Sequence, residues 1–304
     1  MEKVNLRFIT TVIIVLLFFV SNIVLISDLE LSFDEAYYWI YSQNLSFGYF
    51  DHPPMVGLSI KLGTILFGNT ELGVRFLSQI YLIGTLGLVW SMLKNKINII
   101  QFSCLILSMP LISLSGLVAL PDTPLMFFST LYLFYIQKYL DDDSIKNVLI
   151  LALTIAAMFY SKYHGLLIVL LTVCGYPKFL KRKSFWLIAA LVIVFYLPHM
   201  YWQYKHDFVS FKFHLFGRAE KHFSLSNIGD YLGGQFVLMG FGIFAIAMYT
   251  FVKNKFSTPF ERVLIANSFG FLGFLFVLSF RNQIEANWTI SCAIAIIILM
   301  AQYV

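Results

Sequence analysis

The sequence predicts an all-α integral membrane protein, a polytopic helical bundle with about nine or ten transmembrane segments in one domain over residues 1–304. Composition is the first observation behind this prediction. The chain is 59% hydrophobic and only 12% charged, whereas a soluble domain is typically about one quarter charged. The second observation is that apolar runs of about 20 residues, enough for a helix to cross a bilayer, recur along the chain, whose mean hydropathy is +0.80.

Most of the predicted transmembrane segments coincide with single apolar runs. We expect them at about 6–26, 72–93, 98–119, 124–140, 185–202, 231–252 and 260–280. The first is read as a retained helix, because no small-residue cleavage site follows it. The run 147–177 is broken by SKYHG, so it is either one long tilted helix or a hairpin of two short ones. The last run, from Thr289, has about 16 residues, short of a full span, so a C-terminal truncation is expected.

Basic clusters between the runs set the topology. Under the positive-inside rule they mark cytoplasmic loops, and the spans alternate between them only if 147–177 is a hairpin. The amino terminus is then cytoplasmic. The clusters are Lys3/Arg7, Lys94/Lys96, Lys138/Lys146, Lys178/Lys181/Arg182/Lys183 and Lys253/Lys255.

The opposite face, which we predict to be periplasmic, carries the two long loops, 27–71 and 203–230. Part of the first loop, 54–67, is apolar on one helical face, which indicates an interfacial helix. The reactive side chains gather on this outer face, so we expect the function there. They include Asp34, Glu35, Asp51, His52, Asp122, Lys162, His164, Arg218, Lys221, Arg281 and Glu285.

Two short segments of the first loop, Asp34–Glu35 and Asp51–His52, can each be interpreted as structural or as catalytic. Asp34 or Glu35 could accept a proton from a hydroxyl nucleophile, but Ser32 followed by Glu35 also fits a capping box. Asp51 and His52 precede two prolines, which fits a helix start. The same pair could form an oriented acid, a base or a divalent-metal site, although no metal-ligand spacing supports a metal and no cofactor is predicted.

Lys162, at the tip of the proposed hairpin, is costly in a membrane unless it is paired or hydrated. It either snorkels to the interface or binds an anion. Arg218, Lys221 and Arg281 add cations that could hold a phosphate. No Walker loop, dinucleotide fingerprint or HExxH motif occurs, so soluble nucleotide chemistry is unsupported and no nucleic-acid partner is expected. These groups favour a lipid-linked phosphate as substrate.

Seven motifs in order give the chain a family resemblance. It resembles the GT-C glycosyltransferases of the protein O-mannosyltransferase superfamily, and within it the bacterial branch that contains the aminoarabinose transferase of lipid A. The motifs are DEAYYW at 34–39, GYFDHPPM at 48–55, GVRFLS at 73–78, LPDTPLMFF at 120–128, SKYHGLL at 161–167, HDFVSF at 206–211 and EANW at 285–288.

The resemblance implies a GT-C bundle in the bacterial inner membrane. The donor would be a polyprenyl-phosphate-linked sugar, used at the periplasmic face with inversion at the anomeric carbon. The acceptor would be lipid A, lipopolysaccharide or another envelope glycan. The family's catalytic carboxylate maps onto Asp34 and its hairpin lysine onto Lys162, the donor-phosphate ligand. Supporting residues are expected in the matching motifs, at Asp51, His52, Asp122, Tyr163, His164, Glu285 and Asn287.

Two rival functions stay open. A lipid-linked sugar flippase or other transporter needs no catalytic base, but it would be expected to place its ionisable groups near mid-membrane. Transfer to Ser or Thr of a protein uses the same donor chemistry. Neither the sugar nor the acceptor is identified by the sequence.

Overall fold

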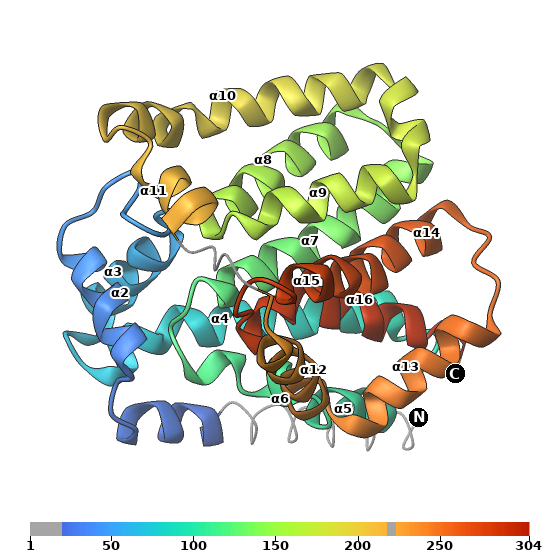
Figure 1. The fold of residues 1–304 in the computed structure, drawn as a ribbon, viewed down its shortest axis with the longest axis horizontal. Helices are drawn as coiled ribbons and strands as arrows, with labels where there is room; N and C mark the ends of the chain where they lie inside the picture. Colours follow the sequence, from blue (N-terminus) through green and yellow to red (C-terminus); the bar gives the residue numbers. More distant parts are fainter. Residues whose placement is uncertain (1–19, 218–222, 304) are drawn as a thin grey trace, which may run out of the picture.

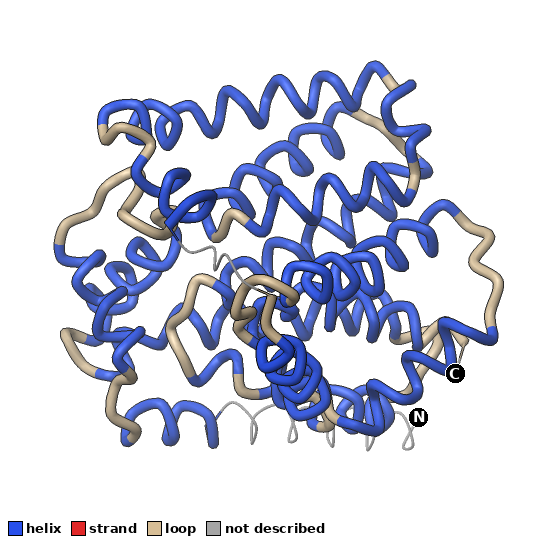
Figure 2. The backbone as a smooth tube through the Cα atoms, viewed as in Figure 1, coloured by secondary structure: helices blue, strands red, loops and turns tan. Residues whose placement is uncertain are grey.

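The computed structural model describes residues 20–217 and 223–303 as an all-helical bundle (Figure 1). Within those residues every regular element is a helix, as Figure 2 shows. The first helix is described from 20 to 28. The predicted fold class is confirmed. The elements that follow are α2 (Phe33–Gln43), α3 (Met55–Phe67), α4 (Glu71–Leu93), α5 (Ile99–Leu107), α6 (Pro110–Ser113), η1 (Ser115–Leu117), α7 (Asp122–Asp141), α8 (Ile145–Ser161), α9 (His164–Gly175), η2 (Pro177–Lys181), α10 (Lys183–Lys205), α11 (Val209–Lys212), η3 (Phe213–Gly217), α12 (Leu225–Met239), α13 (Phe241–Lys253), α14 (Pro259–Ile265), η4 (Ala266–Gly270), α15 (Phe271–Ser279), η5 (Ala286–Thr289) and α16 (Ile290–Met300).

Fewer helices than predicted are long enough to span a membrane singly. Among the described residues, α4, α10 and the continuous stretch Pro259–Ser279 are long and apolar enough, and two bent pairs raise this to five. The run 147–177 is two helices, α8 and α9, separated at Lys162 and Tyr163. The break predicted at SKYHG is therefore confirmed.

The predicted spans 98–119 and 231–252 are not straight helices. The first bends by 91° between α5 and α6, and the second by 100° between α12 and α13. Pro110 explains the first bend, because proline ends a helix before it. Gly240 explains the second, since its φ of 77° lies in the left-handed region. A side chain at Gly240 would collide with the backbone carbonyl of Ser108, so the two bends pack against each other.

The loop predicted at 203–230 is shorter than expected at both described ends. α10 continues to Lys205, and α12 already begins at Leu225, six residues ahead of the predicted 231. Ser224 accounts for the early start, because its Oγ accepts a hydrogen bond from the Asn227 N–H at 3.3 Å and so caps the helix. In the first loop, α3 begins at Met55, so the two prolines lie just before the helix rather than in its first turn.

The last helix lies in the centre of the bundle (Figure 1). Every residue of α16 from Ile290 to Met300 is buried, against α7, α14 and η4. A helix that is apolar on all sides is stable either in lipid or inside a protein core. α16 lies inside the protein core. At one end of the bundle, the left in Figure 1, α2, α3 and α11 gather beside the turn between α8 and α9.

Candidate active site

Asp34 and Glu35 open α2, and the helix turns them to different surroundings. The Ser32 Oγ accepts from the Glu35 N–H at 3.3 Å, and the Glu35 carboxylate accepts from the Ser32 N–H at 3.0 Å. The predicted capping box is confirmed. Glu35 is fully buried, whereas Asp34 is exposed. Successive residues of a helix point about 100° apart, so the inward Glu35 directs Asp34 outward.

Glu35 is held inside the fold by an arginine that sequence reasoning did not place in the site. Arg75 Nε lies 2.6 Å from Glu35 Oε1, and its Nη2 donates to Oε2 at 2.8 Å. The Ala119 N–H donates to Oε1 at 3.0 Å. Burial alone would raise the pKa of Glu35, but these bonds outweigh it and hold the pKa below its ordinary value. Both Glu35 oxygens bond within the fold, so we treat Glu35 as a support for Asp34, which differs from its predicted catalytic role.

Tyr38 lies among three of the predicted carboxylates. It is buried, and burial is the main cause that raises the pKa of its hydroxyl. The negative charges of Asp51, Asp122 and Asp34 raise this pKa further. Three carboxylates that lie up to 88 positions apart in the sequence therefore act on one buried hydroxyl.

Asp51 is the centre of a hydrogen-bonded cluster. Asp51 Oδ1 accepts from the hydroxyls of Tyr41 at 2.5 Å and Tyr37 at 3.3 Å, and His52 Nδ1 lies at an ion-pair distance of 3.1 Å from it. Burial would raise the pKa of Asp51, but His52 and the two tyrosines outweigh it and lower the pKa. In the described ranges, no three His, Cys, Asp or Glu side chains group as a metal site.

Lys162 is buried in an ion pair with Asp122. The Lys162 Nζ lies 2.8 and 2.9 Å from the two carboxylate oxygens, and the Asn287 amide donates to the same carboxylate at 3.0 Å. Trp288 places its ring centroid 5.5 Å from Nζ. The lysine ends α8, the aspartate opens α7 and the asparagine lies in η5. Three predicted site residues thus meet, and Lys162 is paired rather than snorkelling.

The other predicted residues lie outside the Asp51 cluster and the Lys162–Asp122 pair. The Tyr163 hydroxyl lies 3.2 Å from His199 Nε2, and the His164 ring lies 4.8 Å from that of Trp288. Arg281 and Glu285 are exposed, in the turn that also carries Asn287. Arg218 and Lys221 lie outside the described residues.

A polar network that sequence reasoning missed joins the outer loops to α10. His199 Nδ1 lies 2.6 Å from the Phe47 carbonyl, and the Gln203 amide donates to the Tyr163 hydroxyl at 2.9 Å and to Ser210 Oγ at 2.8 Å. Ser210 in turn donates to the Tyr49 carbonyl at 2.6 Å. His199 could have indicated this network from the sequence, because it is an ionisable residue inside an apolar run. In a membrane protein such a residue usually makes a functional or structural contact.

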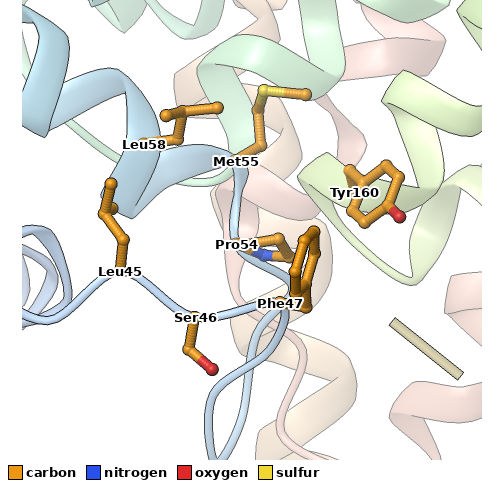
Figure 3. A pocket seen from close by; sticks show the side chains of 7 residues that line it. All are labelled: Leu45, Ser46, Phe47, Pro54, Met55, Leu58 and Tyr160. Atoms are coloured by element: carbon orange, nitrogen blue, oxygen red, sulfur yellow. The ribbon is translucent and has the colours of Figure 1, made fainter. Parts of the chain in front are cut away.

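An apolar groove of 440 Å³ adjoins the Asp51–His52 segment. Its lining comes from the loop after α2, the start of α3 and one residue of α8. Figure 3 shows Phe47 and Pro54 side by side, Tyr160 beyond them, and Leu45 and Leu58 along the other side. Its volume is in the range of sites that bury a small organic ligand or part of a lipid.

Residues 51–202, half of the chain, match the family described as dolichyl-phosphate-mannose-protein mannosyltransferase. The chain therefore belongs to this family, and the resemblance stated from the seven motifs is confirmed. The matched segment contains Asp51, Asp122, Lys162 and most of the groove.

Particular relatives share most of the chain. Lipid A galacturonosyltransferase RgtD from Rhizobium johnstonii is 25% identical over 279 residues, which cover 86% of this chain and 58% of the relative. The crystal structure of ArnT from Cupriavidus metallidurans in the apo state superposes with a TM-score of 0.75 at 15% identity, over 99% of this chain and 60% of that one. ArnT bound to undecaprenyl phosphate gives 0.74 at 14% identity, over 97% and 59%.

The likeness to ArnT establishes the fold of a multi-pass helical membrane protein. The chain spans about three fifths of the length of these relatives.

Proposed function

We propose that the chain is an inverting glycosyltransferase of the bacterial inner membrane. It would move a sugar from a polyprenyl-phosphate carrier to lipid A, lipopolysaccharide or another envelope glycan at the periplasmic face. The observation that carries this proposal is an exposed carboxylate, Asp34, whose charge acts with those of Asp51 and Asp122 on the buried Tyr38. The segment of Asp51 and His52 leads into an apolar groove. The named activity of RgtD and the undecaprenyl phosphate bound by ArnT support it.

In the proposed reaction an acceptor oxygen attacks C1 of the sugar opposite the phosphate. The bond from C1 to the phosphate oxygen breaks, its electron pair leaves with the polyprenyl phosphate, and a single displacement inverts C1. Asp34 takes the proton of an acceptor hydroxyl. If the acceptor is already an anionic phosphate of lipid A, Asp34 instead positions it or stabilises positive charge on the sugar.

The leaving phosphate would be met by Lys162. Two of the three ammonium N–H groups bond to Asp122, which leaves the third to donate to a phosphate oxygen. Arg281, Arg218 and Lys221 are further candidate ligands of this phosphate. The groove would take the first isoprene units of the carrier, because its lining is almost wholly apolar.

The test supplies purified protein with a panel of labelled undecaprenyl-phosphate sugars and with lipid A or a Ser/Thr-containing peptide. Wild type should form a glycosidic product on lipid A and release undecaprenyl phosphate, and Asp34→Asn should be slower by about 10²- to 10⁴-fold. Asp28→Asn, at an exposed carboxylate on the last residue of the first helix, is the matched control and should transfer normally.

Three results would overturn parts of this proposal. Equal transfer by Asp34→Asn would remove Asp34 from the mechanism. A product on the peptide alone would make the chain a protein glycosyltransferase. Movement of intact donor across a vesicle membrane with no product would make it a flippase.

A further inference from the structure

Arg75, on α4, has every N–H group of its buried guanidinium bonded. The side chain is 3% exposed. Nε and one Nη2 bond go to Glu35. The other Nη2 bond goes to the Glu30 carbonyl at 2.8 Å, and the two Nη1 bonds go to the carbonyls of Ile26 at 3.1 Å and Leu29 at 2.6 Å. Five bonds match the five donors of an arginine.

These bonds join separate chain segments to α4. Ile26 belongs to the first helix, and Leu29 and Glu30 belong to the link that follows it. Glu35 then connects the same cluster to Ala119, three residues before Asp122. The end of the first membrane helix, the start of α2 and the approach to α7 are thus fixed to one guanidinium.

We propose that Arg75 is a positioning residue that sets the place of Asp34 relative to the membrane and to the Asp122–Lys162 pair. This inference rests on the proposed function, in which Asp34 meets the acceptor. Asp34 immediately precedes Glu35 on the same turn, so a shift of the anchored Glu35 backbone moves Asp34 with it. Displacement of a catalytic group by about 1 Å can cost about 100-fold in rate.

Arg75→Lys tests the proposal, since lysine keeps the charge but cannot form the fork to a carboxylate and three carbonyls together. We expect kcat per mole of folded protein to fall by about tenfold or more, with the KM for the donor within about threefold of wild type, because the groove does not contact this cluster. A purely structural role would lower the folded fraction and leave kcat of the folded molecules unchanged.

Arg182→Lys is the matched control. Arg182 also donates to the carbonyls at a helix end, to Tyr139 at 2.6 Å and Leu140 at 2.8 Å, but it lies at the basic η2 segment away from the site. Its replacement should leave kcat of the folded protein unchanged. If Arg75→Lys does not fold, Glu35→Gln, which keeps the three carbonyl bonds of Arg75, should show the same loss of kcat.

A double variant separates positioning from general damage. If Arg75 acts through Asp34, Arg75→Lys adds little to the loss already caused by Asp34→Asn, whereas independent effects multiply. Three outcomes would each overturn the inference. Folded Arg75→Lys could have the kcat of wild type, or the losses of the two substitutions could multiply in the double variant. Alternatively, both Arg75→Lys and Glu35→Gln could fail to fold. Normal transfer by Asp34→Asn would instead overturn the proposed function.

Discussion

Lys162 and Asp122 form a buried ion pair across 40 positions of sequence, with Nζ 2.8 and 2.9 Å from the two carboxylate oxygens. Both side chains are buried, with 7% of Lys162 and 6% of Asp122 exposed. The Asn287 amide, from a third segment, donates a further hydrogen bond to the Asp122 carboxylate. Together with the Asn287 bond, the pair therefore links the α8–α9 turn to the start of α7 and to η5.

Lys162→Met should destabilise the protein, because it leaves the Asp122 charge buried with only Asn287 to compensate it. Breaking a buried pair from one side typically costs about 3–5 kcal/mol. The double variant Lys162→Met/Asp122→Asn should recover part of that loss, as measured by thermal unfolding in detergent. Lys146→Met, at an exposed lysine, should unfold like wild type. If the double variant is no more stable than Lys162→Met, the two charges are not coupled.

Much of the fold follows from the sequence, and the deviations have physical causes. The charge alternation and SKYHG predicted two helices in 147–177, and Ser32 with Glu35 predicted the cap of α2. Apolar composition, in contrast, does not distinguish a straight span from a bent pair, and it does not predict that the Gly240 bend packs against the Ser108 carbonyl of the other bend. Nor does it distinguish a helix in lipid from one buried in protein, as α16 is.

The sequence predicted a set of candidate site residues but not their pairing in the fold. The predicted outer face and the ordered motifs selected Asp34, Asp122 and Lys162, of which the fold pairs Asp122 with Lys162. The partner of Glu35 was not predictable, because the distance between Arg75 and Glu35 is set by the tertiary packing of α2 and α4 against α3. The burial that makes Glu35 a support rather than a catalytic group is equally a property of that packing.

In a plot of thermal stability against pH, Tyr41→Phe should shift the loss of stability at acid pH to a higher pH. The hydrogen bond from Tyr41 helps to hold the pKa of Asp51 below its ordinary value. A carboxylate with a lowered folded pKa stabilises the protein above its unfolded pKa, and this contribution is lost as pH falls through the folded pKa. Without Tyr41 the folded pKa rises, so the loss begins at higher pH. Thermal unfolding from about pH 3 to pH 7 measures this.

Tyr204→Phe is the control for that shift, because Tyr204 is 67% exposed on α10. Its profile should coincide with that of wild type. An acid limb of Tyr41→Phe that also coincides with wild type would show that the hydroxyl does not stabilise the Asp51 carboxylate.

Gly63→Ala should separate α3 from α4. A Cβ at Gly63 would collide with the backbone carbonyl of Gly73, which cannot move as a side chain can. We expect a loss of about 1–3 kcal/mol in the free energy of unfolding. Gly87→Ala, on the exposed face of α4 with open space around it, should be neutral or stabilising by up to about 1 kcal/mol. Equal stability of the two variants would contradict the close contact.

Met55→Trp should obstruct the groove and raise the KM for a long-chain polyprenyl donor by about tenfold, since each CH₂ excluded from an apolar site forfeits about 0.8 kcal/mol. A donor with a one-isoprene carrier should be affected far less, because little of its chain would enter. Leu66→Trp, at a 65% exposed position near the end of the same helix, is the control and should leave both KM values unchanged. A Met55→Trp variant with the same KM as wild type for the long-chain donor would place the carrier outside the groove.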